Sequence, residues 1–206
     1  MPLVGAACGS MIQLQLTAAG FLGQNISQMA TAIGNGVINS ILSMATYTGT
    51  STGMGLGAGT STGKIAGAIV IGPTLGNLIY LQMTAQGLVG EKAQSFANAV
   101  GAGIANYIAS AAIVTGASTV VGIGAGTGVI VGVVGAAVGS QILAMMTANG
   151  LLGKNARNLA NAIGNGVALA IQSSTVTTSI VGVAIGTVPP ALPPIPSVGT
   201  DTGKIV

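Results

Sequence analysis

One passage of sequence occurs three times in this chain. The segment from Gly9 to Gly23 returns as 76–90 and again as 139–153, and each copy ends on the pattern Thr-Ala-x-Gly-x-x-Gly. A second pattern, Ala-x-Gly-x-Gly, follows each copy at 32–36, 99–103 and 162–166. Glycine and alanine persist in the copies whereas no reactive side chain does. The repeat therefore points to packing and assembly rather than to catalysis.

The copies divide the chain into three tandem units, at 1–70, 71–133 and 134–206. Thr60 to Ile65 is echoed by the last residues of the chain, Thr200 to Ile205, so we expect three whole units. A proline-rich connection at 188–197 lies within the third unit. Its prolines favour a stiff, extended conformation close to polyproline II.

The first half of each unit predicts a helix, a turn and a second helix. Met11 to Ala19 has no helix breaker inside it, and Gly20 stands where a left-handed C-cap belongs. Phe21-Leu22-Gly23 then forms the corner, and Asn25 is a good N-cap for the next helix. The spacing of apolar residues predicts the equivalent second helices at 93–108 and 156–171.

Each second helix carries a Gly-x-Gly near its middle, although a glycine inside a helix costs about 1 kcal/mol relative to alanine. Close approach of another helix would offset this cost, because small residues let backbones touch. A kink or a helix end is the rival interpretation. We take these glycines as the candidate assembly interface: Gly34, Gly36, Gly101, Gly103, Gly164 and Gly166.

The second half of each unit consists mostly of Gly, Ser, Thr and small apolar residues. The β-forming residues of 176–181 favour short strands, with glycines at turns or bulges. Extended loops lying on a neighbouring subunit fit the same composition. The predicted fold class is mainly α with Gly-rich extended or short β segments, arranged as three tandem helix-turn-helix plus Gly-rich arm repeats.

Composition indicates a surface that is largely covered. The 206 residues are 3% charged and 50% hydrophobic, whereas an ordinary soluble domain is about 25% charged. Small side chains bury little area each, so an isolated chain would be marginally stable and oligomerisation would help. We therefore expect most of the surface to meet protein or lipid, with copies of the chain itself among its partners.

Several kinds of chemistry are excluded by residue type. With no histidine and a single cysteine, the chain lacks the commonest metal ligand and general base, and we expect no metal site, no cofactor and no enzyme activity. Its five basic residues are scattered singly, which argues against nucleic-acid binding. Cys8 is expected to be a small buried thiol.

The uncharged segment 116–146 is the one membrane signal. About 20 apolar residues can cross a bilayer as a helix, and Gly128, Gly132, Gly135 and Gly139 have the small-residue spacing of transmembrane contacts. No aromatic belt or flanking basic cluster accompanies it. A membrane-inserting, oligomeric or pore-forming protein that uses this glycine row is thus the alternative function.

The Gly-x-Gly helices and the Thr-Gly-Lys-Ile segments, 62–65 and 202–205, resemble small structural proteins of contractile phage tails and baseplates. The resemblance is one of composition and internal duplication over the whole chain, and it carries over no functional residue. It implies a non-enzymatic component of a tailed-bacteriophage virion, located in the particle and bound to copies of itself and other virion proteins. A self-assembling extracellular fibre or surface layer is a further possibility.

Overall fold

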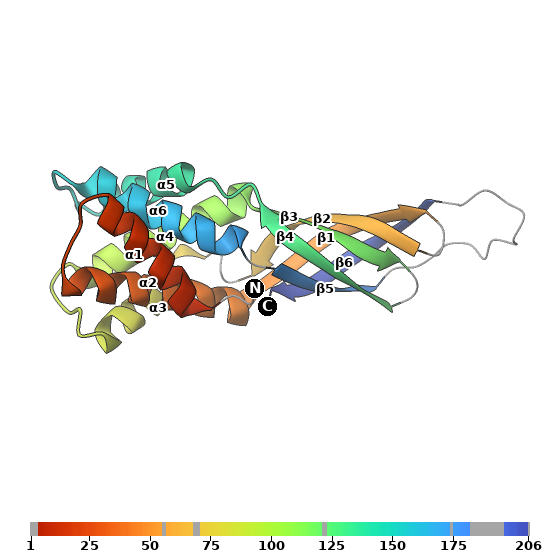
Figure 1. Cartoon of the computed structure of the whole chain (residues 1–206), viewed down its shortest axis with the longest axis horizontal. Helices are drawn as coiled ribbons and strands as arrows, with labels where there is room; N and C mark the ends of the chain where they lie inside the picture. Colours follow the sequence, from red (N-terminus) through yellow and green to blue (C-terminus); the bar gives the residue numbers. More distant parts are fainter. Residues whose placement is uncertain are drawn as a thin grey trace, which may run out of the picture.

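The computed structural model describes residues 4–54, 57–67, 71–120, 123–173, 175–181 and 196–205. Within these residues two helices are followed by two strands, and this order occurs three times, as shown in Figure 1. The chain is thus mainly helical with short antiparallel strands, as the sequence predicted. The helices are α1 (Gly5–Ala18), α2 (Gln24–Met44), α3 (Gly72–Ala85), α4 (Ala93–Ala111), α5 (Gly135–Ala148) and α6 (Ala156–Gln172). The strands are β1 (Ala45–Met54), β2 (Gly57–Gly67), β3 (Ile113–Val120), β4 (Ile123–Val131), β5 (Thr175–Val181) and β6 (Pro196–Ile205).

The helices lie together at one end of an elongated molecule (Figure 1), and their contacts close into a ring. α1 packs on α2, α3 on α4, and α5 on α6, as hairpins of consecutive helices. Neighbouring hairpins meet where α2 packs on α3 and α4 packs on α5. The last helix, α6, packs back on the first, α1, so one chain completes the ring. We call the contacts α2/α3, α4/α5 and α6/α1 the seams of the ring.

The strands form a closed antiparallel sheet that extends away from the ring (Figure 1). Consecutive strands pair in order, and β1 pairs with β6 to close the sheet. The Gly-rich segments are therefore strands of the same chain where the structure describes them, and the alternative of loops on a neighbouring subunit is wrong there. The first strand of each unit pairs with two neighbours: Thr48 pairs with Lys64 and Thr202, Thr115 with Val129 and Thr62, and Thr177 with Lys204 and Thr127.

The corner of each helix hairpin has the predicted glycine C-cap. Gly20 has a φ of 84°, Gly87 of 76° and Gly150 of 67°, which is the left-handed region. In the first corner the Phe21 amide donates to the Leu16 carbonyl at 2.9 Å, and the other corners repeat this bond. The predicted Asn25 N-cap is wrong: α2 begins at Gln24, and Gly23 is its N-cap, with no side chain capping the helix.

Ile, Val, Leu, Met and Ala fill the interior of the ring. Because aromatic side chains are scarce, the largest fully buried side chains are aliphatic, among them Ile33, Ile104 and Ile142. The helices can approach closely only because alanine and glycine occupy most remaining interior positions. Of the proline-rich connection 188–197, the structure describes only Pro196 and Ser197, which begin β6, and the remainder lies outside the described residues.

Segment 116–146 does not form one membrane-spanning helix. It contains the end of β3, all of β4 and most of α5, with residues 121–122 outside the described part. Gly132 has a φ of 81°, which no α-helix contains, and α5 starts at Gly135. None of the helices that the structure describes has both the length and the apolar character needed to cross a bilayer. The expectation of a continuous glycine-row helix is thus wrong.

Candidate assembly interface

The first glycine of each Gly-x-Gly lies against the preceding helix of its own hairpin. A Cβ added to Gly34 would stand 2.7 Å from the Cα of Gly9, and one added to Gly164 would stand 2.8 Å from the Cα of Gly139. Gly101 and Gly76 form the equivalent pair in the middle hairpin, at 2.6 Å. These distances are too short for any side chain, so glycine faces glycine at each crossing.

The second glycine of each pair lies at a seam, against the next hairpin of the ring. A Cβ on Gly36 would stand 2.8 Å from the Cα of Ile79, and one on Gly103 would stand 2.5 Å from the Cα of Ile142. Gly166 makes the corresponding approach to Ile12, at 2.5 Å from its Cα. Since Ile12 belongs to the first helix and Gly166 to the last, this third contact closes the ring with the geometry of the other two.

The predicted interface is therefore placed within one chain and not between chains. All six glycines are buried against helices of the same molecule, so their contact surfaces are occupied and cannot also bind a second copy. The close-approach interpretation is confirmed, and the kink or helix end is wrong, because α2, α4 and α6 continue through the glycines. The missed signal was the repeated passage itself, which supplies Gly9 and Ile12 and their equivalents as partners.

At the level of the ring nearest the sheet, the Tyr107 hydroxyl of α4 bridges two backbone groups of the segment that leads into α5. The Tyr107 hydroxyl donates to the Gly132 carbonyl at 2.8 Å and accepts from the Val134 amide at 3.1 Å, which fixes the segment leading into α5. Ser40 occupies the equivalent position of α2. Its buried Oγ has no hydrogen-bond partner among the described residues. The equivalent position of α6 is Ala170, so this level departs from threefold equivalence.

Removing the Tyr107 hydroxyl is expected to weaken the connection between β4 and α5. Tyr107→Phe leaves the Gly132 carbonyl and the Val134 amide without this partner. Both residues are exposed, so water partly replaces the hydroxyl and the loss of these hydrogen bonds costs about 1 kcal/mol in the free energy of unfolding. Chemical denaturation measures this loss. Ser40→Ala is the matched control, because it removes a buried hydroxyl without a partner in the described structure and should not destabilise the chain. An equal loss in both variants would contradict the proposed role of the Tyr107 hydroxyl.

Cys8 lies on the inner side of α1 and is 1% exposed. Burial disfavours its charged form and raises the pKa of the Cys8 thiol to about 12. The expectation of a small buried thiol is confirmed. Its position on α1 makes it a reporter for the ring, since a reagent reaches it only when α1 leaves its place.

Cys8 is expected to resist a thiol reagent near pH 8 until the chain unfolds. The raised pKa alone lowers the thiolate fraction by about a thousandfold relative to the unfolded chain, and burial blocks access as well. Labelling with a chromogenic disulfide in increasing urea should follow the unfolding transition measured by circular dichroism. Rapid labelling of the folded chain would show that α1 detaches from the ring.

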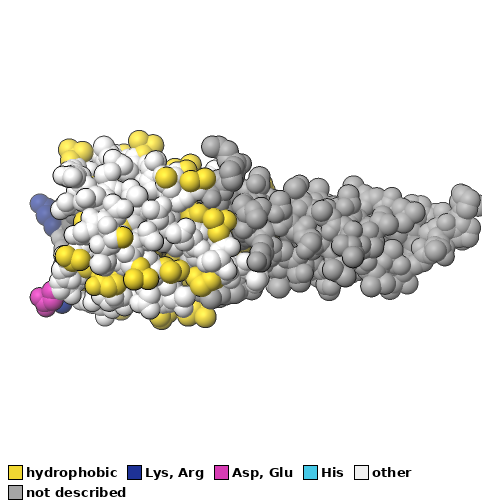
Figure 2. All heavy atoms as spheres, turned by 90° about the horizontal axis from the view of Figure 1, so that it is seen from below, with side chains coloured by type: hydrophobic (Ala, Val, Ile, Leu, Met, Phe, Trp, Pro, Cys, Tyr) yellow, Lys and Arg dark blue, Asp and Glu magenta, His cyan; other side chains and the backbone are white. Residues whose placement is uncertain are grey.

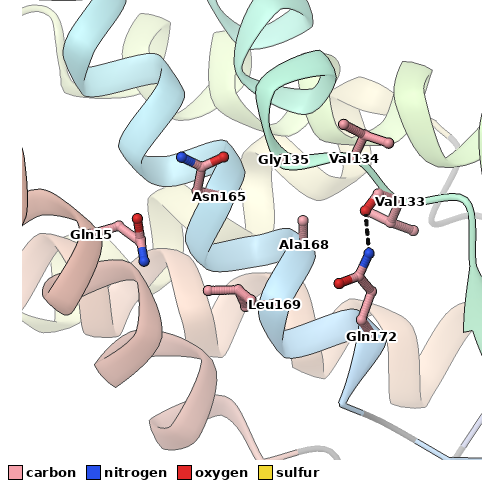
Figure 3. A pocket seen from close by; sticks show the side chains of 8 residues that line it. All are labelled: Gln15, Val133, Val134, Gly135, Asn165, Ala168, Leu169 and Gln172. Atoms are coloured by element: carbon pink, nitrogen blue, oxygen red, sulfur yellow. Dashed lines mark hydrogen bonds between the residues drawn. The ribbon is translucent and has the colours of Figure 1, made fainter.

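A shallow groove of about 340 Å³ lies over α6, between Gln15 of α1 on one side and residues 133–135, which lead into α5, on the other. Figure 3 shows Gln15 from α1 facing α6, with Asn165 and Leu169 on the α6 side. The Gln172 side-chain amide donates to the Val133 carbonyl at 2.6 Å at the far end of the groove (Figure 3). Carboxamide and aliphatic groups line it, so it has hydrogen-bonding capacity but no titratable group. It resembles an imperfectly filled seam more than a reaction site.

Different side chains occupy equivalent positions at the seams, although each seam has the same contact between a glycine and an isoleucine. At α4/α5 the residue equivalent to Gln15 is Met145, and the Asn106 side-chain amide approaches its sulfur at 4.0 Å.

Across the described residues no group of His, Cys, Asp and Glu side chains is arranged to hold a metal ion. Comparison with known protein families, with characterised proteins and with solved structures finds no match.

Proposed function

We propose that the chain is a non-enzymatic structural component of a tailed-phage virion, located in the tail or baseplate. The observation that carries this proposal is the closing contact of the ring. Gly166 meets Ile12 as Gly36 meets Ile79, so one chain presents approximate threefold symmetry around its long axis. A chain with three such units suits a place on a threefold or sixfold axis of the particle.

We also propose that the chain consists of three tandem repeats, each a helix hairpin followed by a Gly-rich arm. The strand order supports this proposal, because β1, β3 and β5 each pair with the second strand of their own unit and with that of the preceding unit around the closed sheet. The small Gly, Ser and Thr side chains of the arms suit a narrow closed sheet, in which bulky side chains would crowd one another. In a virion the arms would give a stiff axial rod and the helix ring its base.

The intramolecular ring changes the expected stoichiometry. From the sequence, several chains were expected to meet through their glycines around an axis. Because one chain already provides all three hairpins of its ring, a single copy on each axis satisfies the symmetry. The other virion proteins would then contact the outer surface of the helices, where leucines such as Leu14 (65% exposed) and Leu81 (61% exposed) lie.

Immunoelectron microscopy of purified particles tests the proposal. Antibodies raised against the recombinant chain should label virions of the phage that encodes it at the tail or baseplate. Quantitative mass spectrometry should find a copy number well below that of the ring-forming tail proteins. The proposal is contradicted if particles freed of soluble protein contain none of the chain. Unaided polymerisation of the purified chain into filaments would instead favour the extracellular fibre.

A further inference from the structure

The corners of the helix hairpins lie together at the end of the ring that points away from the sheet (Figure 1). We call this surface the corner end and define it by residues 20–24, 87–92 and 150–157. Each corner directs one apolar side chain outward: Leu22 is 77% exposed, Val89 68% and Leu152 68%. The residue before each of them packs against the core instead. Corners usually carry polar residues, so three exposed aliphatic side chains at one end call for an explanation.

All charged residues of the helix ring are also at the corner end. Glu91, Lys92, Lys154 and Arg157 are exposed there. Figure 2 shows basic and acidic side chains at the end of the helical part that points away from the sheet. The remainder of the ring sequence, from 4 to 44, 71 to 111 and 132 to 173, contains no other charge. Three cations against one anion give this surface a net charge of +2. No ion pair within the described residues neutralises the cations.

Backbone donors add to the positive character of the corner end. The C-terminal carbonyls of α1, α3 and α5 are satisfied by the corner amides, as in the bond from Leu88 N to Met83 O at 2.9 Å. The N-termini of α2, α4 and α6 also lie at this end, and no side chain caps any of them. Acceptors are thus paired. Of the first-turn donors, the Ile26, Ala93 and Ala156 amides donate to the carbonyls of Gly23, Gly90 and Gly153. The dipoles of the three helices still favour a ligand that carries negative charge at this end.

We propose that the corner end docks on an anionic lipid surface. Leu22, Val89 and Leu152 enter the boundary between headgroups and acyl chains, and Lys92, Lys154 and Arg157 bind the lipid phosphates. Apolar insertion and electrostatic attraction to anionic lipids together determine how strongly such a surface binds. The long axis of the molecule would then lie along the bilayer normal, with the sheet pointing away from the membrane surface.

The distribution of charge favours lipid over a threefold-symmetric protein. The apolar residue recurs in all three corners, but the charges do not: one corner carries Glu91 and Lys92, another Lys154 and Arg157, and the first has none. A symmetric protein would present identical groups to three different corners. Mobile lipids can redistribute beneath an uneven set of charges, and a flat surface accepts three apolar contacts in any rotation.

Vesicle cosedimentation of the full chain tests this inference. The probes are vesicles of phosphatidylcholine alone and vesicles in which about a third of the lipid is phosphatidylglycerol. Two triple variants separate the contributions: Leu22→Ser with Val89→Ser and Leu152→Ser, and Lys92→Gln with Lys154→Gln and Arg157→Gln. The matched control is Leu14→Ser with Leu81→Ser, which removes two largely exposed leucines from the side of the ring. Circular dichroism confirms that each variant is folded.

The unmodified chain should bind the anionic vesicles and bind phosphatidylcholine only weakly. The charge variant should lose about a hundredfold in partition, which corresponds to about fivefold for each cation, and the apolar variant at least about tenfold. The control should bind as the unmodified chain does. Absence of binding to anionic vesicles overturns the inference, and so does an equal loss in the control. Because virion labelling does not depend on lipid, the virion proposal can fail or succeed separately.

Discussion

Gly166→Ala should destabilise the chain by at least about 3 kcal/mol, although alanine ordinarily favours a helix by about 1 kcal/mol over glycine. The new methyl group would stand 2.5 Å from the Cα of Ile12, and a backbone atom cannot move aside as a flexible side chain can. Gly36→Ala and Gly103→Ala should cause similar losses because they meet Ile79 and Ile142 in the same way. Thermal unfolding should show a fall in Tm of at least about 6 °C for each.

Gly153→Ala is the matched control for these substitutions. A Cβ at Gly153 meets no atom within 4 Å, and its φ lies outside the left-handed range, so alanine fits there without strain. The control is expected to be neutral or to stabilise the chain by a few tenths of a kcal/mol. If Gly166→Ala behaved like the control while Gly36→Ala and Gly103→Ala were destabilising, the α6/α1 seam would not be closed as described.

The three isoleucines that face the seam glycines should contribute similar amounts to the free energy of unfolding. Ile12, Ile79 and Ile142 are each 0% exposed, and they occupy the same position in α1, α3 and α5. Truncation of a buried isoleucine to alanine costs about 2–5 kcal/mol through lost burial and the cavity left behind. We expect the variants Ile12→Ala, Ile79→Ala and Ile142→Ala to lose free energy of unfolding within about 1 kcal/mol of one another, measured in urea.

Leu14→Ala and Leu81→Ala provide the comparison within the same helices. Both leucines are largely exposed, so their truncation should change stability by no more than about 0.5 kcal/mol. A loss at Ile12 much smaller than at Ile79 and Ile142 would indicate that the first and last helices pack loosely. It would make the ring an open arc rather than a closed one.

The helical part of the fold could be predicted because its signals are local. Gly20 and its equivalents mark the ends of the first helices through their left-handed conformation, and this effect depends only on neighbouring residues. The second helices were predicted close to their observed bounds; α6 ends one residue beyond the expected Ile171. Repetition helped as well, since a pattern seen in one unit could be checked in two others.

The strands and the seams could not be predicted with equal certainty. The residues of β1 and β2 are largely glycine, serine and threonine, so no alternation of apolar and polar side chains distinguishes a strand from an extended loop. Close approach at Gly166 could be inferred from its glycine, but the identity of the partner could not. Glycine has no side chain whose chemistry would identify its contact partner, and Ile12 lies near the other end of the chain. The choice between intramolecular and intermolecular contact therefore required the three-dimensional structure.

Chemical cross-linking of α1 to α6 is the most direct test of the closed ring. Ala18 and Asn158 are exposed residues that line one groove between these helices, so Ala18→Cys with Asn158→Cys places two thiols within reach of a short bismaleimide. The buried Cys8 should not react in the folded chain. At low protein concentration the account predicts a cross-link within one molecule, which leaves the mass monomeric and joins peptides of α1 and α6. Products that consist only of cross-linked dimers and larger species would show that α6 meets α1 of another chain, and would contradict it.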